Sequence, residues 1–93
     1  MPKYVIEREL PGAGDLSDDE IHGVSQKSNE VLGAMAPRVQ WQHSYVCDDR
    51  LFCVYIADDV EGVREHARRG GFPVTNVYKV NRVIDPTTGE AAV

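Results

Sequence analysis

The stretch 39–57 constrains the fold of this chain more than any other part of the sequence. It reads VQWQHSYVCDDRLFCVYIA, two runs of β-branched and aromatic residues separated by Asp48 and Asp49. Runs of this kind around a short polar break predict two antiparallel strands joined by a tight turn. With the two aspartates at the turn, Ser44 pairs with Cys53, and the hairpin becomes the centre of a larger sheet.

Strand side chains alternate between two faces, so this register predicts what each face carries. The face that we expect to form the core carries mainly apolar side chains: Trp41, His43, Tyr45, Phe52, Val54 and Ile56. The face that we expect to remain uncovered is polar but uncharged: Gln40, Gln42, Ser44, Cys53 and Tyr55, with Val46 and Leu51 near the turn. On this interpretation His43 is a buried, neutral histidine.

A helix is predicted between residues 17 and 36, before the hairpin. Ser17 fits the N-cap position, and Glu20 three residues later completes a capping box. Apolar residues then recur at helical spacing as far as Met35, and Pro37 stops the pattern.

Three further elements complete the predicted fold. A strand at 3–10 precedes the first helix, a second helix runs from Asp58 to the Gly70-Gly71 pair, and a last strand is predicted at 76–84. The order β-α-β-β-α-β is that of an α+β, ferredoxin-like fold, in which two helices cover one face of a four-stranded antiparallel sheet. We expect a single domain over residues 1–93, with a loose tail at 85–93.

The uncovered face of the sheet predicts a homodimer of the dimeric α/β-barrel type, because isologous dimers are the commonest oligomers. A net charge of −5 argues against a nucleic-acid partner. No apolar run approaches the roughly 20 residues of a membrane span, and the N-terminus lacks the apolar core of a signal peptide. We therefore expect a cytoplasmic protein with both cysteines reduced.

Two residues are candidates for metal ligation. Cys53 is predicted on the uncovered face beside Ser44 and Tyr55, where it lines a ligand pocket, ligates a soft metal such as nickel, or packs as a small core residue. His66, on the second helix, is a metal ligand, an acid–base group near neutral pH, or a hydrogen-bonded residue at the edge of the core. The predicted register places Cys53 on the side of the sheet away from His66, so a site that used both would need a bulge, a different turn length or a partner subunit.

The sequence contains no motif that announces an enzyme. The glycines at 12 and 14 lack the lysine and hydroxyl residue of a phosphate loop. No nucleophile–base arrangement can be read from spacing. The acidic residues of 15–20 are largely explained by helix capping.

The chain also resembles a known family. The runs SNEVL, W-x-x-SYV-x-x-D-R-x-x-C-x-Y-x-A and VREHARRGGFP are similar to a small bacterial domain family of formerly unknown function, typified by a nickel-binding protein of actinomycetes. The similarity extends from about Tyr4 to Val83. It implies a ferredoxin-like homodimer that binds nickel, and it draws attention to the matching positions Ser44, Tyr45, Cys53, Tyr55 and His66.

Three functional hypotheses follow. The first is a small dimeric nickel-binding protein with Cys53 and His66 as ligands. The second is a small-molecule-binding or catalytic module that resembles dimeric ferredoxin-like monooxygenases and isomerases, with Ser44, Tyr45 and Tyr55 at the ligand. The third is a structural or regulatory dimer without a ligand.

Overall fold

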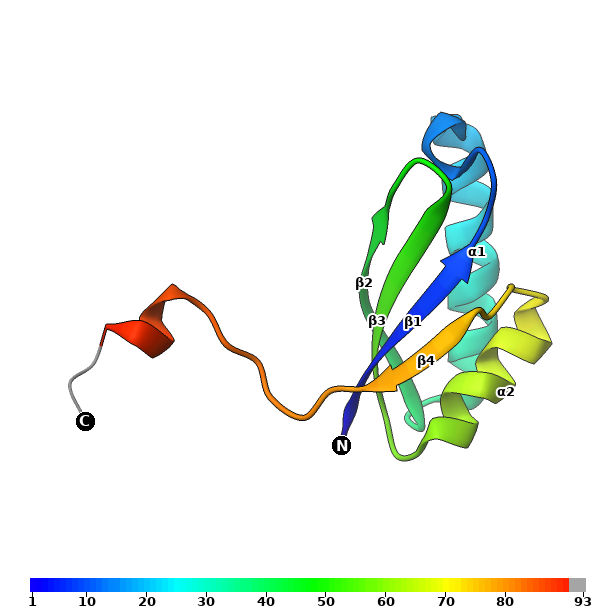
Figure 1. Cartoon of the computed structure of the whole chain (residues 1–93). Helices are drawn as coiled ribbons and strands as arrows, with labels where there is room; N and C mark the ends of the chain where they lie inside the picture. Colours follow the sequence, from blue (N-terminus) through cyan, green and yellow to red (C-terminus); the bar gives the residue numbers. More distant parts are fainter. Residues whose placement is uncertain (91–93) are drawn as a thin grey trace.

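The computed structural model describes residues 1–90, and its elements follow the predicted order (Figure 1). They are β1 (Lys3–Glu9), η1 (Ala13–Asp15), α1 (Asp18–Met35), β2 (Val39–Val46), β3 (Arg50–Ala57), α2 (Val60–Gly70), β4 (Asn76–Lys79) and η2 (Pro86–Gly89). The four strands form one antiparallel sheet in the order β2-β3-β1-β4. Both helices lie against the same face, so the predicted ferredoxin-like α+β fold is confirmed.

The helix ends are set by local side-chain chemistry. Ser17 and Glu20 form the predicted capping box at the start of α1. At α2 the N-cap is Asp59, whose carboxylate accepts from the Gly62 N–H, so the cap lies one residue later than Asp58. Gly71 ends α2 in the left-handed region (φ 70°), which glycine adopts without the steric strain of a side chain.

The hairpin register is confirmed near its turn and wrong near its open end. Ser44 pairs with Cys53, as predicted. A bulge between Trp41 and His43 then shifts the register, so that Trp41 pairs with Tyr55 instead of Ile56. Because one extra residue reverses the alternation, Trp41 lies on the same face as Ser44.

The predicted assignment of the two sheet faces is wrong from His43 to Ile56, whereas Gln40 and Trp41, before the bulge, lie on the predicted sides. The helix-facing side buries Cys53 and Tyr55 together with Ile6 of β1, against Met35 of α1 and Val63 of α2. The side without helices carries His43, Tyr45, Phe52, Val54 and Ile56; we call it the open face. His43 is therefore exposed, not buried. Since β3 is apolar on both sides, its own pattern does not distinguish the faces, and packing of the whole sheet decides.

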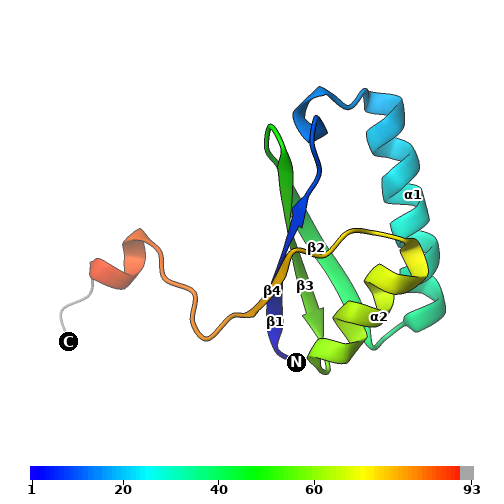
Figure 2. The same cartoon turned by 45° about the vertical axis from the view of Figure 1, so that its right-hand side comes forward.

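The last strand is shorter than the predicted 76–84. Lys79 pairs with Tyr4, and the Val80 N–H donates to the Lys3 carbonyl. Because β1 begins at Lys3, the chain beyond Val80 has no strand left to pair with. Residues 81–90 are exposed and extend away from the domain (Figure 2). The remainder of the predicted tail, 91–93, lies outside the described residues.

No helix within residues 1–90 has the length and apolarity needed to cross a membrane.

Candidate functional site

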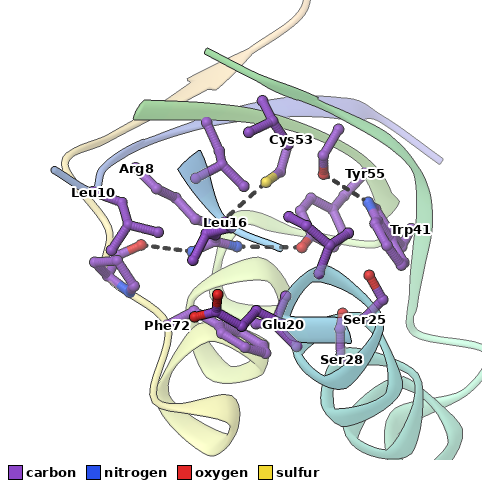
Figure 3. A pocket seen from close by; sticks show the side chains of 16 residues that line it. Arg8, Leu10, Leu16, Glu20, Ser25, Ser28, Trp41, Cys53, Tyr55 and Phe72 are labelled. Atoms are coloured by element: carbon purple, nitrogen blue, oxygen red, sulfur yellow. Dashed lines mark hydrogen bonds between the residues drawn. The ribbon is translucent and has the colours of Figure 1, made fainter. Parts of the chain in front are cut away.

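A cavity of about 490 Å³ lies between the helix-facing side of the sheet and α1 (Figure 3). Its origin is the unequal length of the two helices. An 18-residue α1 spans about 27 Å and an 11-residue α2 about 16 Å, so α2 does not cover the turn end of the hairpin. The loop after α2, with Phe72 and Pro73, closes one side of this space.

Arg8 is the central charged residue of the cavity. It is 5% exposed, because the alternation of β1 turns it to the same side as the buried Tyr4 and Ile6. Its guanidinium donates to the Tyr55 hydroxyl (Nη2 to Oη 3.2 Å) and to the Pro73 carbonyl (Nη1 to O 2.7 Å).

Two further contacts fix the Arg8 side chain. Its Nε donates to the Cys53 sulfur, with Nε to Sγ 3.4 Å. The guanidinium carbon lies 5.5 Å from the centroid of the Phe72 ring, a cation–π distance. Figure 3 shows the guanidinium between Cys53, Tyr55 and Phe72. None of these partners is a carboxylate.

His66 lies in the core, packed against the rings of Tyr55 and Phe72. It is 0% exposed, and its Nε2 is 3.2 Å from the Ser28 hydroxyl of α1. Burial, with the positive charge of Arg8 as the second cause, lowers the pKa of His66 to about 4. The ring is therefore neutral near pH 7. Among residues 1–90 its Nδ1 has no hydrogen-bond partner.

Tyr55 connects the arginine to the histidine. Its ring centroid lies 5.2 Å from that of His66, and its hydroxyl accepts from Arg8. Burial raises the pKa of Tyr55, with the charge of Arg8 opposing the shift. The phenol is thus a neutral hydrogen-bonding group near pH 7.

The structure brings four of the five predicted site residues together. Ser44, Cys53 and Tyr55 line the cavity, and His66 packs on Tyr55. Tyr45 does not join them: it lies on the open face and is 59% exposed. Cys53 and His66 lie on the same side of the sheet, so the predicted separation of these two residues is wrong.

Sequence reasoning missed Arg8, Trp41 and Phe72. Arg8 alternates with Tyr4 and Ile6 along one strand, a signal for a charged residue placed on an apolar face. Trp41 reaches the cavity only because of the bulge, which no local pattern announces. Its indole N–H donates to the Ser44 hydroxyl at 2.9 Å.

The described residues of one chain do not fit a nickel site. Cys53 receives a hydrogen bond from a cationic guanidinium, which repels a metal ion at the same sulfur. His66 is enclosed, and its Nε2 is occupied by Ser28. Within residues 1–90 no three His, Cys, Asp or Glu side chains gather at a distance suited to one metal ion.

The open face has a different character. His43 and Tyr45 make an edge-to-face pair, with ring centroids 5.0 Å apart and His43 Nε2 3.1 Å from the Tyr45 hydroxyl. Glu7 accepts from Asn76 and pairs with Arg50. The hydrogen bond from Asn76 and the charge of Arg50 hold the pKa of Glu7 below its usual value.

Two comparisons with known proteins give matches. A family model described as "Nickel responsive protein SCO4226-like" matches residues 4–80. A crystal structure of SCO4226 from Streptomyces coelicolor A3(2) is similar with a TM-score of 0.74, at 14% sequence identity, over 88% of this chain and 99% of that one. No curated protein matches the chain. At this identity the structural likeness establishes the fold alone.

Proposed function

Because the chain belongs to the SCO4226-like family of nickel responsive proteins, we propose that it is a cytoplasmic homodimer that binds nickel at a site shared by two copies. Membership of this family is the observation that carries the proposal, and it makes this a small metal-related protein. The two unpaired cysteines, Cys47 and Cys53, suit a reducing compartment. The net charge of −5 gives no reason to add a nucleic-acid partner.

The sharing of the site follows from the supply of ligands. One chain gathers no group of three ligands within residues 1–90, and Cys53 is in contact with a guanidinium. An isologous interface presents every residue twice, so one histidine near the two-fold axis supplies two imidazoles. His43 is the exposed histidine of the open face.

The open face also suits a second copy of the chain. It has no helix over it within the described residues, and two of its aromatic side chains, Tyr45 and Tyr78, are 59% and 51% exposed. Aromatic residues are enriched in protein interfaces because they bury much apolar area and keep a polar tip. The imidazole of His43 uses Nε2 toward Tyr45, and Nδ1 is left for a metal.

The test is a nickel titration by calorimetry on untagged protein, with light scattering on the same samples. We expect a dimer that binds nickel, and we expect His43→Ala to abolish binding. Cys53→Ala and His66→Ala should bind nickel as the unmodified protein does.

Two results would contradict the proposal. A monomer at micromolar concentration that still binds nickel would refute a shared site. Loss of nickel binding in His66→Ala and Cys53→Ala, with His43→Ala unaffected, would make Cys53 and His66 the ligands, as in the first of the three sequence-based hypotheses.

A further inference from the structure

The buried guanidinium of Arg8 has no anionic side chain to balance it. Within residues 1–90 no carboxylate forms an ion pair with Arg8. A buried charge that lacks a partner of opposite sign destabilises a fold, so arginine is almost never fully buried without one. The positive charge is directed to a cavity wide enough to admit a molecule.

The guanidinium also retains hydrogen-bonding capacity. It has five N–H groups, and three of them are used by Cys53, Pro73 and Tyr55. Each of the three nitrogens donates one N–H to these partners. Nη1 and Nη2 each carry a second N–H, and neither of these has a partner among residues 1–90. Two N–H groups on neighbouring nitrogens match the two oxygens of a carboxylate.

Most of the remaining cavity wall is apolar, with Glu20 and three serines as its polar members. Around Arg8 its walls are formed mainly by aliphatic side chains: Leu10, Leu16, Ile21, Val24, Val46 and Leu51. A volume of about 490 Å³ lies within the range of roughly 300–1,000 Å³ that is usual for small-molecule sites. These walls favour a ligand whose body is hydrocarbon, and they disfavour a compact polar anion such as inorganic phosphate.

Glu20 limits the charge of the ligand. Its carboxylate also lines the cavity, but Oε1 is engaged by the Ser17 N–H of the helix cap at 3.1 Å, and it makes no ion pair with Arg8. A ligand with a second negative charge would meet this carboxylate. The arrangement therefore favours a single carboxylate group.

We propose that the cavity binds a small organic monocarboxylate, with its carboxylate on Arg8 beside the Tyr55 hydroxyl and its apolar body between α1 and the hairpin. This binding uses no metal and does not depend on the nickel site. Aliphatic and aromatic acids share this chemistry, so both are included in the test.

Trp41, the one tryptophan of the chain, lines the cavity and makes binding visible. The experiment titrates the full-length protein with octanoate and with 3-phenylpropanoate, followed by Trp41 fluorescence and by calorimetry. We expect at least one acid to bind, and octanamide, octylammonium and inorganic phosphate to bind at least tenfold more weakly. Suberate, which carries a second carboxylate, should also bind more weakly than octanoate.

Variants then test the assigned residues. Arg8→Met should weaken octanoate binding at least tenfold, and the matched change Arg64→Met, at an exposed position of α2, should leave it unaltered. Glu20→Gln keeps the capping box and should strengthen suberate binding. Thermal unfolding checks that each variant is folded.

The comparison of octanoate with octanamide needs no variant, so the proposal remains falsifiable if Arg8→Met does not fold. Equal affinity of acid and amide would overturn it. Absence of binding by both acids at millimolar concentration would overturn it as well. Neither result bears on nickel binding at the open face.

Discussion

The helix-facing side of the sheet keeps an arginine and a histidine away from water, whereas the open face leaves a histidine and two tyrosines exposed. Arg8 and His66 are 5% and 0% exposed, against 59% for Tyr45 and 51% for Tyr78. Arg8, Tyr45 and Tyr78 all lie on strands of one sheet, and His66 comes from α2, which packs on it, so the contrast arises from what covers each side. On one side the polar groups are bonded to one another and form a cavity wall; on the other, apolar and aromatic groups lack a cover within the described chain.

This contrast separates two functions within one small domain. Binding of a small molecule requires a wall held in place by packing, which the helix-facing side has. Binding of a second copy requires a wide exposed surface with apolar and aromatic side chains, which the open face has. The following substitutions test whether the two sides are as independent as this comparison implies.

The largest effect is expected from truncating one isoleucine on each side. Ile6 is 0% exposed on the helix-facing side, so Ile6→Ala should destabilise the protein by roughly 2–5 kcal/mol. Ile56, half-buried on the open face, should lose less than about 2 kcal/mol on the same change. Urea unfolding measures both.

Concentration provides the control for this pair. If a second copy covers the open face, the loss in Ile56→Ala should grow with protein concentration, because dimers are stabilised by mass action. Equal losses in the two variants at every concentration would break the comparison.

The next largest effect is a pH dependence of the free energy of unfolding that arises from His66. Its pKa is about 4 when folded and about 6.5 when unfolded, so the unfolded chain takes up the proton first. Stability from this residue is full above pH 6.5 and falls as the pH drops toward 4, by roughly 2 kcal/mol between pH 7 and pH 5. Urea unfolding at these two pH values should show the loss.

Matched histidine variants identify the source of that slope. His66→Gln should flatten it, whereas His43→Gln on the open face should retain it. A proton titration of the His66 ring by NMR in the native protein gives the pKa directly, and a midpoint near 6.5 would refute the assignment.

Gly70 tests how tightly the cavity edge is packed. An added Cβ would lie 2.2 Å from Cε2 of Phe72, so Gly70→Ala must displace the ring that stacks on Arg8. We expect a loss of about 1–2 kcal/mol, because the half-buried ring can swing outward. Gly23→Ala in α1 meets no atom within 4 Å and should instead gain about 1 kcal/mol. A gain in both would mean that helix propensity, and not Phe72, determines the result.

Local signals predicted the secondary structure well. The capping box of Ser17 and Glu20 and the Gly70-Gly71 stop involve neighbouring residues, so the sequence displays them directly. The predicted hairpin turn also rests on adjacent residues. The fold class followed from the order of these elements.

The orientation of the sheet was not predictable from the hairpin alone. Phe52, Val54 and Ile56 are as apolar as Leu51, Cys53 and Tyr55, so alternation along β3 gives no direction. The bulge between Trp41 and His43 then reversed the alternation for the residues before it, Val39 to Trp41. Only β1, where Tyr4 and Ile6 oppose Glu7 and Glu9, distinguishes core from exposed side, and that strand also held the missed Arg8.

The smallest effect on stability, and the sharpest test, comes from two adjacent residues at the end of β2. Tyr45 and Val46 are 59% and 46% exposed, yet alternation points the first to the open face and the second to the cavity. Tyr45→Ser and Val46→Ser should each change the free energy of unfolding of the monomer by only about 0.5 kcal/mol, because exposed side chains contribute little. Their functional effects should be opposite. Tyr45→Ser should weaken self-association and leave octanoate binding unaltered, whereas Val46→Ser should weaken octanoate binding and leave self-association unaltered. If either variant impaired both properties, the cavity and the interface would not be independent. Adjacent strand residues point to opposite sides of the sheet, so one substitution affects both only if the two sides are coupled.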